Sequence, residues 1–389
     1  MATLVRVLIL AMVLAVVSCA RPAALQAGPG VELTPLRTIS RLESQALLAA
    51  AGVRGVEPAY DVDCYRMTYR ANAAVLTGLL ALPRGTHARR LVSFQHGTTT
   101  SRDRVPSALD GAGQAAAVLI AGSGYALIMP DYEGLGGSGG PHPYLVADSA
   151  AAAVVAMIQS ARSVEGVPDG PVFLSGFSQG GQATLAAMRM LEAAGEPVLG
   201  AAPVAGPYDI RDVSLGVALT GQAPSDALYL AYMSWGYAAY YDQPLESVLT
   251  PDYAGVADNL FSTPHEGRAI MEALPREPRA MFSASFLDAF DNNGEHWLLT
   301  RLGQSDVSDW TPRAPVRLYY GSADIDVAPE EALHAQRSMR ARGADVRAVD
   351  VGPVGHDPSM LAAAPLILAW LAELDAQGAG PVVAAPRLR

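Results

Sequence analysis

An α/β domain with a mostly parallel sheet and helices on both faces is the fold class that the sequence predicts. The prediction rests on short apolar runs that alternate with longer helical patterns, because this rhythm is typical of parallel strands joined by crossover helices. The runs that predict strands are Leu91–Gln95, Ala126–Met129, Val172–Leu174, Val198–Val204, Val316–Tyr320 and Val346–Val351. The helical patterns are Ala112–Gly122, Tyr144–Arg162, Gln179–Ala194, Pro329–Arg342 and Asp357–Ala376.

Two features mark the edges of this domain. Residues Tyr60–Tyr69 and Val75–Leu82 alternate between apolar and polar, which predicts an antiparallel hairpin joined by a turn at residues 70–72. We expect the folded domain to begin near Thr38 and its core to consist of residues 38–207 and 313–389.

Residues 208–312 interrupt the alternation. A structureless loop of this length is implausible inside a compact domain, so we expect a helical cap, or lid. Aromatic residues recur in it at helical spacing, and they belong either to a core of the cap or to a wall of a substrate pocket. Two stripes have this spacing: the first contains Tyr229, Met233, Gly236 and Tyr240, and the second contains Phe282, Phe286 and Phe290.

Composition excludes several functions. The 389 residues are 50% hydrophobic and 17% charged, which favours a large buried core over disorder. The net charge is −11, lysine is absent and no basic cluster occurs, so nucleic acid is not an expected partner. Metal-binding signatures are absent as well, and we expect neither a metal nor another cofactor.

The N-terminus predicts export. Residues 1–18 have the positive residue and short apolar run of a signal peptide. Val16-Val17-Ser18-Cys19 resembles a bacterial lipobox, in which the cysteine becomes the lipidated N-terminus. We therefore expect residues 19–37 to be a lipidated linker, and an exported bacterial protein anchored to the cell envelope through Cys19. An ordinary cleaved signal with an incidental cysteine is the alternative, and Cys64 is expected to be a buried apolar residue.

Two stretches match the G-x-S-x-G pattern of a nucleophilic serine. Ser178 follows a predicted strand and precedes a predicted helix, as a nucleophile on a sharp strand-to-helix turn requires. Ser138 is followed by Pro141 and Pro143, which prevent a helix from starting there, so we interpret it as a loop residue. The same prolines exclude a dinucleotide site at the G-x-G-x-x-G match of residues 134–139. Ser178 is therefore the predicted nucleophile.

A nucleophilic serine needs a base and an acid that orients the base. His356 stands after the last predicted strand and before the last helix, where it reaches the carboxyl ends of the strands. The acid is expected at the end of the preceding strand, where Asp324 and Asp326 both stand. We favour Asp324, because it is closer to the strand end, and keep Asp326 as the alternative.

The oxyanion formed during acyl transfer needs two backbone N–H donors. One is expected from Gln179, the residue after the nucleophile, and the other from Thr98 in the loop after the first central strand. His96 in that loop is interpreted as structural, because it precedes Ser178 in the chain.

Together these residues make residues 91–370 resemble the α/β-hydrolase superfamily, and within it the secretory lipases and lipase-A-like esterases. The resemblance rests on residues 94–98, 130–136, 142–144, 176–181, 321–324 and 355–357. It implies the α/β-hydrolase fold, a helical lid between the sixth and seventh strands, and hydrolysis of a small-molecule or lipid ester through an acyl-enzyme.

Two other functions stay open. A peptidase on the same fold would need an acidic pair to hold a substrate amine, and the sequence identifies none. A lipid-anchored binding protein that had lost its chemistry would not need Ser178, Asp324 and His356, all of which are present. The patterns leave the oligomeric state open.

Overall fold

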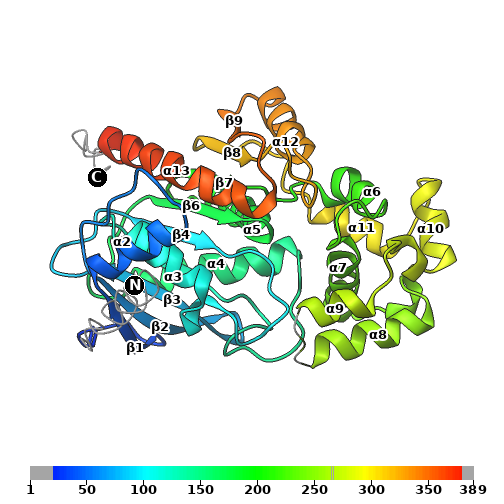
Figure 1. The fold of residues 1–389 in the computed structure, drawn as a ribbon, viewed down its shortest axis with the longest axis horizontal. Coiled ribbons are helices and arrows are strands. Elements are labelled where there is room, and N and C mark those ends of the chain that lie inside the picture. The colour runs from blue at the N-terminus through cyan, green and yellow to red at the C-terminus, as the bar shows by residue number, and fades with distance from the viewer. Residues whose placement is uncertain (1–20, 264, 266, 379–389) are drawn as a thin grey trace, which may run out of the picture.

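The computed structural model describes residues 21–263, 265 and 267–378, which form one mixed sheet flanked by helices (Figure 1). The strands are β1 (Glu32–Ile39), β2 (Val62–Ala71), β3 (Ala74–Pro83), β4 (Leu91–Gln95), β5 (Ala126–Pro130), β6 (Val172–Phe177), β7 (Val198–Val204), β8 (Val316–Tyr320) and β9 (Val346–Asp350). Their order across the sheet is β1-β2-β3-β5-β4-β6-β7-β8-β9. Strands β5, β4, β6, β7, β8 and β9 are parallel, which confirms the predicted α/β fold class.

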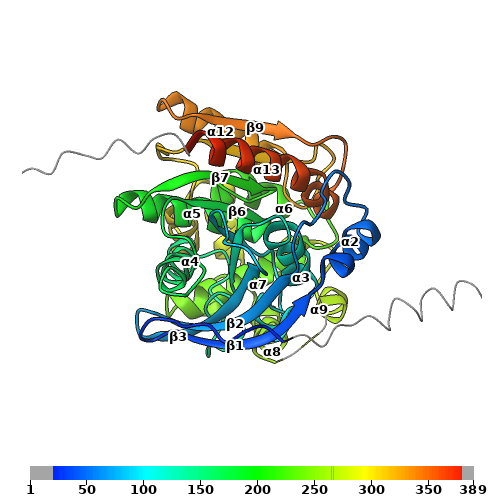
Figure 2. The same ribbon diagram turned by 90° about the vertical axis from the view of Figure 1, so that its left-hand side faces the viewer.

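Helices cover both faces of this sheet. Those between and after the strands are α2 (Arg41–Ala50), α3 (Gly111–Ala116), α4 (Ala147–Ala161), α5 (Gln179–Ala193), α12 (Glu330–Ala341) and α13 (His356–Gly378). Short 3₁₀ or π-helical segments occur at Pro106–Ala108, Ala117–Ala121, Ile210–Ser214, Leu245–Ser247 and Pro278–Met281. Figure 2 shows α4 and α5 on one side of the strands and α2 and α3 on the other.

The hydrophobic core consists of one layer on each side of the sheet. Side chains of a strand point alternately to its two faces, so a strand covered on both sides is apolar throughout. In β6, Val172 and Leu174 pack in the layer beneath α4, α5 and α12, whereas Phe173 packs in the layer beneath α3 and α13. Both layers hold the carboxyl ends of the parallel strands in fixed positions.

The first strand corrects the predicted domain boundary. Residues 32–37 were expected to belong to the linker, but they lie in β1, which pairs antiparallel with β2. Pro35 hides this strand in the sequence, since proline lacks a backbone N–H, and the pairing register shifts between Pro35 and Arg37. An edge strand tolerates both features. Residues 1–18 and Cys19 lie outside the described residues.

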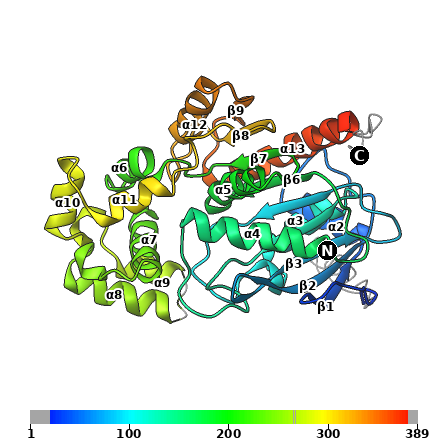
Figure 3. The same ribbon diagram turned by 180° about the vertical axis from the view of Figure 1, so that it is seen from behind.

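The segment between β7 and β8 is helical. It contains α6 (Leu215–Ala218), α7 (Asp226–Tyr240), α8 (Pro251–Ser262), α9 (Gly267–Ala273), α10 (Ala284–Asp291) and α11 (Trp297–Gln304). These helices stand beyond one end of the sheet in Figure 3 and share a hydrophobic cluster of their own with residues 144–146. We call this segment, residues 208–312, the cap.

Helix α13 is the only helix in the described ranges with the length and hydropathy to span a bilayer. It lies instead on the sheet, where Ile367, Trp370 and Leu371 are buried and the Trp370 ring meets Phe173 edge-on at 5.6 Å between centroids. Its first residue is His356, so the packing of α13 also sets the position of that side chain.

Candidate active site

Ser178 lies on a strained turn between β6 and α5. Its backbone has φ 57° and ψ −121°, a conformation that costs energy for any residue other than glycine. The turn depends on the glycines around it: a Cβ on Gly180 would lie 2.0 Å from the carbonyl oxygen of Gln95, and one on Gly176 would lie 2.3 Å from that of Gly180. The glycines of the G-x-S-x-G pattern therefore allow β4, β6 and α5 to approach one another.

Three side chains from separate strand ends form a hydrogen-bonded chain. The Oγ of Ser178 lies 2.9 Å from Nε2 of His356, and Nδ1 of His356 lies 2.7 Å from Oδ2 of Asp324. All three residues are buried. The other oxygen of Asp324 accepts hydrogen bonds from the backbone N–H groups of residues 326 and 327, each at 3.0 Å. These contacts hold the carboxylate in one orientation toward His356.

The structure distinguishes between the two candidate acids. Asp324 contacts His356, whereas Asp326 accepts a hydrogen bond from the Ser225 hydroxyl of the cap. The loop that carries Asp324 lies close to the loop that precedes His356. This approach depends on Gly321, where a Cβ would lie 2.3 Å from the carbonyl oxygen of Val354.

The predicted oxyanion donors are Gln179, which follows Ser178 in the chain, and Thr98, which follows β4. Gln179 is the first residue of α5, where backbone N–H groups lack an intrahelical acceptor. Thr98 follows β4, and its hydroxyl lies 2.8 Å from the hydroxyl of Tyr144. The preceding Gly97 packs against Phe177, the residue before Ser178, since a Cβ on Gly97 would lie 3.1 Å from the Phe177 ring. The donor roles of both residues stay predictions.

His142 is a neighbour of the site to which the sequence analysis assigned no role. Its Nδ1 lies 2.7 Å from the carbonyl oxygen of Glu133, and its Nε2 lies 2.7 Å from Nε2 of Gln179. Burial lowers the pKa of His142 to about 4, so the ring is neutral near pH 7. The neutral ring donates from Nδ1 to Glu133 and accepts at Nε2 from the Gln179 amide. In the sequence, its only signals are its place between two prolines and its membership of the 142–144 stretch on which the resemblance rests.

His96 and Ser138, which the sequence analysis did not interpret as catalytic, both have structural hydrogen-bond partners. His96 lies 2.7 Å from the carbonyl oxygen of Gly97 through Nδ1 and 3.3 Å from that of Asp131 through Nε2. The Ser138 hydroxyl accepts a hydrogen bond from the N–H of Gly134 at 3.0 Å, within the loop after β5.

A cavity of about 60 Å³ opens at Ser178 between the sheet and the cap. The core contributes Ser178, Gln179 and the loop that contains Asp326. The cap contributes mainly apolar side chains from the start of the segment and from α7, namely Ile210, Leu215, Val217, Ala218, Tyr229, Leu230 and Met233. Neither Trp235 nor Phe286 lines it, because both pack within the cap.

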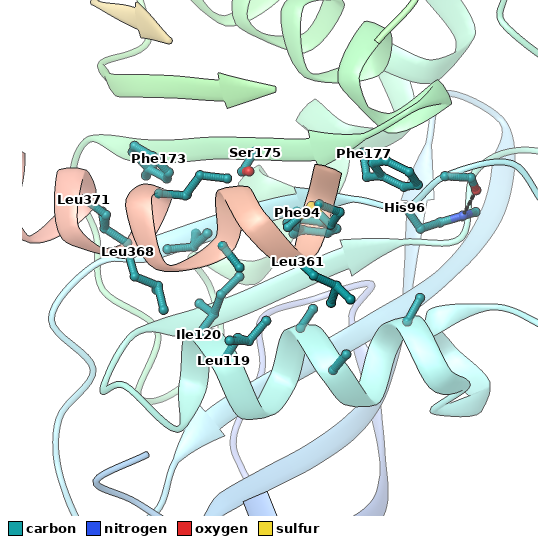
Figure 4. A pocket seen from close by; sticks show the side chains of 18 residues that line it. Phe94, His96, Leu119, Ile120, Phe173, Ser175, Phe177, Leu361, Leu368 and Leu371 are labelled. Carbon is teal, nitrogen blue, oxygen red and sulfur yellow. Dashed lines mark hydrogen bonds between the residues drawn. The ribbon is translucent and has the colours of Figure 1, made fainter. Parts of the chain in front are cut away.

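A second cavity, of about 140 Å³, lies between α3, α13 and the sheet (Figure 4). Its lining is almost wholly apolar and includes none of Ser178, Asp324 and His356. It borders the site at Phe177, whose ring lies 4.7 Å from that of His356 between centroids, and at His96 and Gly97 of the loop that carries Thr98. Ser178, Asp324 and His356 therefore face the smaller cavity or neither, and not this larger one.

Metal ligands and free thiols do not gather at this site. The described residues contain no group of three or more histidine, cysteine or carboxylate side chains placed to hold a metal ion. Cys64 is buried in β2, and burial raises the pKa of its thiol to about 12.

Solved structures with this arrangement identify the fold. A putative hydrolase from Legionella pneumophila superposes with a TM-score of 0.79 at 24% identity, over 94% of this chain and 100% of that one. The chain has the α/β-hydrolase fold. A rice cell wall degrading esterase from Xanthomonas oryzae gives 0.74 at 24% identity, over 91% and 97% of the chains. Lipase A from Candida antarctica, in its closed state, gives 0.65 at 16% identity, over 94% and 86%.

The sequence of this hydrolase also matches a family model. Residues 110–207 match the model of the secretory lipase family, which confirms the resemblance inferred from the motifs. Comparison with curated proteins gives no match. The family match supports a carboxylic ester hydrolase and, at a coarse level, an exported protein.

Proposed function

We propose that the protein is a serine carboxylic ester hydrolase that works through an acyl-enzyme, with Ser178 as nucleophile, His356 as base and Asp324 as orienting acid. The observation that carries the proposal is the chain of two hydrogen bonds, 2.9 Å and 2.7 Å long, that ends at Ser178 on its strained turn. The match to the secretory lipase family supports an ester as the substrate.

The geometry suits each step of acyl transfer. Nε2 of His356 accepts the proton as Oγ of Ser178 attacks the ester carbonyl, and Asp324 stabilises the imidazolium through Nδ1. The N–H groups of Gln179 and Thr98 stabilise the oxyanion. His356 then protonates the departing alkoxide, and a water molecule activated by His356 hydrolyses the acyl-enzyme.

His142 positions one of these oxyanion donors. It holds the Gln179 side chain at the first turn of α5, and Gln179 supplies the N–H that faces the oxyanion in this mechanism. Its ring must stay neutral to accept that hydrogen bond, and burial achieves this by lowering its pKa.

Labelling with a fluorophosphonate tests the proposal, since only an activated serine reacts. We expect one label, on Ser178, and turnover of p-nitrophenyl esters of graded acyl length. A folded protein that neither takes the label nor hydrolyses any ester of the series would be a binding protein instead.

We further propose that the cap selects the acyl group. Cap side chains form most of the apolar wall of the cavity at Ser178, and a closed cap excludes water from that wall. The acyl chain length that the enzyme prefers should therefore depend on cap residues.

Export and lipidation at Cys19 form a separate proposal. Mass spectrometry of the membrane-extracted protein should find a mature N-terminus at Cys19 that carries acyl groups, and Cys19→Ser should release the protein from the membrane or block its processing. Cleavage that removes Cys19 would contradict the anchor and leave export in place.

A further inference from the structure

Two tyrosine hydroxyls hold the loop that carries the predicted oxyanion donor Thr98. The Oγ1 of Thr98 lies 2.8 Å from the hydroxyl of Tyr144, and the Tyr232 hydroxyl donates to the carbonyl oxygen of Thr99 at 3.2 Å. Consecutive residues of the loop are thus held, one through its side chain and the next through its backbone. Burial raises the pKa of both phenols, so both hydroxyls keep their protons near pH 7.

Residues 98–100 depend on these contacts because their backbone has few others. They follow β4 without regular secondary structure. Among the described residues, no hydrogen bond links the N–H or C=O groups of residues 98–100 to the backbone of another segment. The N–H of Thr98 therefore stays available in this part of the chain, as a donor to an oxyanion must.

The two tyrosines form a stack that joins the core to the cap. Tyr144 belongs to the segment before α4 and Tyr232 to α7, and their rings stack at 4.6 Å between centroids with 23° between the ring planes. Tyr144 is 3% exposed and Tyr232 is 2% exposed. Helix α7 packs closely on the segment that contains Tyr144, since a Cβ on Gly236 would lie 2.9 Å from the backbone nitrogen of Tyr144. The stack and this packing bring both hydroxyls to the same loop.

The segment that contains Tyr144 also contacts the other predicted donor. His142 lies two residues before Tyr144, and its Nε2 lies 2.7 Å from Nε2 of Gln179. Side chains of residues 142–144 therefore contact both residues whose N–H groups are expected to stabilise the oxyanion.

We propose that Tyr144 and Tyr232 are positioning residues that hold the N–H of Thr98 in the oxyanion hole, so that the cap supplies one of its supports. The inference rests on the proposed function, in which that N–H stabilises the oxyanion. Tyr232 differs in this from the cap side chains that select the acyl group, because it does not line the cavity at Ser178. Without either hydroxyl, the N–H of Thr98 remains but is less well aligned with the developing charge. This weakens binding of the transition state more than binding of the substrate.

Tyr144→Phe and Tyr232→Phe test the proposal, because each removes one hydroxyl and keeps the ring. Each should lower kcat for p-nitrophenyl esters about tenfold, which is less than the loss of about 10²–10³ that follows removal of a whole oxyanion donor. KM should stay within about twofold of the wild type, because the ground state loses little. The loss should be the same for every acyl length in the series.

Inhibition by butylboronic acid is the second measurement. Oγ of Ser178 adds to the boron atom and the serine proton passes to His356, which gives a tetrahedral anion whose hydroxyl group lies where the oxyanion lies. The Ki of the inhibitor should therefore rise in each variant by about the factor by which kcat falls. A tyrosine that only stabilised the fold would lower the melting temperature and leave the Ki unchanged.

Tyr237→Phe is the matched control. The Tyr237 hydroxyl also belongs to α7, is buried, and donates to a carbonyl oxygen of the core, that of Leu145, at 2.9 Å. It lies on the same helix as Tyr232 but holds a different segment. This variant should keep the wild-type kcat and the wild-type Ki for butylboronic acid.

A double variant tests whether Tyr144 acts through Thr98. Tyr144→Phe and Thr98→Ala each remove one end of the same contact, and Thr98→Ala keeps the backbone N–H. The variant with both changes should therefore be no slower than the slower of the two single variants.

Three results would overturn the positioning role. One is a wild-type kcat and boronic acid Ki in either tyrosine variant. Another is a double variant in which the losses of Tyr144→Phe and Thr98→Ala multiply, because Tyr144 would then act without Thr98. The third is a loss that varies with acyl length, which would indicate direct contact with the acyl group. In each case ester hydrolysis by the wild-type protein and fluorophosphonate labelling of Ser178 would still support the proposed function.

Discussion

The core and the cap of this hydrolase hold their residues in different ways. In the core, the proposed catalytic side chains stand at the ends of parallel strands, and close backbone packing at Gly180 and Gly321 leaves no space for a Cβ atom. The cap has its own hydrophobic cluster and faces Ser178 mainly with apolar side chains. A rigid core can therefore keep the chemistry constant while changes in the cap alter the acyl group that fits.

The junction between the two parts is polar. The Glu331 carboxylate of α12 accepts hydrogen bonds from the N–H groups of Tyr208 and Asp209, each at 2.8 Å, and from the Ser214 hydroxyl. Farther along the cap, α7 approaches the core at Gly236, where a Cβ would lie 2.8 Å from the carbonyl oxygen of His142. The core thus fixes where the cap begins as well as where α7 lies.

The largest expected effect comes from the nucleophile in the core. Ser178→Ala should lower kcat by about 10⁶, because the acyl-enzyme can no longer form, and should leave thermal stability close to that of the wild type. Steady-state kinetics with a p-nitrophenyl ester and a melting curve measure both. Ser138→Ala is the matched control and should hydrolyse the ester almost normally. Retention of more than about a hundredth of the wild-type rate by Ser178→Ala would reject the assignment.

The second effect compares the two aspartates of one loop. Asp324→Asn should lower kcat for a neutral ester by about 10⁴, because the His356 tautomer is no longer fixed. Asp326→Asn should lower it less than about tenfold, since its carboxylate contacts Ser225 of the cap instead. Reversed effects would make Asp326 the acid that orients His356.

Sequence patterns predicted the core closely. Strands β4, β7 and β8 have the predicted bounds, because each is a short apolar run buried on both faces. Strand β1 was missed because Pro35 and a register shift break its pattern. Chain order and strand ends were enough to place Ser178 and His356 in one site. They favoured Asp324 over Asp326 only because it is closer to the strand end, since the loop contacts that hold Asp324 against His356 are contained in no pattern.

The cap shows where sequence reasoning stops. Helical spacing identifies the apolar stripe of α7 but not what the stripe faces. Trp235 lies inside the cap against Tyr232 and Phe261, whereas Met233, two residues earlier, lines the cavity at Ser178. The hydrogen bond between His142 and Gln179 joins residues 37 apart in the chain, and local spacing does not predict such a contact.

The third prediction separates these two kinds of cap residue. Phe286→Ala removes a fully buried ring that stacks on Phe282, and it should cost about 3–5 kcal/mol of stability without changing the preferred acyl length. Leu230→Ala enlarges the cavity at Ser178, and it should shift the preference toward longer or bulkier acyl groups. The readouts are the melting temperature and kcat/KM across p-nitrophenyl esters of graded length. An unchanged length profile in Leu230→Ala would mean that the cap is structural only.

The smallest expected effect concerns the junction at Glu331 and appears only when pH is varied. Burial raises the pKa of Glu331 to about 8, although the hydrogen bonds from Ser214, Asp209 and Tyr208 oppose the shift. The charge of Asp209 adds to the increase, and Asp209 itself lies 3.4 Å from Nε2 of His334. The folded protein binds the proton of the Glu331 carboxyl more tightly than the unfolded chain does. The free energy of unfolding that this difference contributes is therefore fully present below about pH 4.5. It is lost as the pH rises to about 8.

The uncharged variant Glu331→Gln keeps an acceptor for the backbone N–H groups but cannot ionise. Its melting temperature relative to the wild type should therefore rise by a few degrees between pH 5 and pH 9. Glu330→Gln, at the exposed neighbouring position of α12, is the control and should show no such trend. A constant difference between Glu331→Gln and the wild type at all pH values would mean that Glu331 does not titrate in this range. The junction would then hold the cap with equal strength at every pH in the range tested.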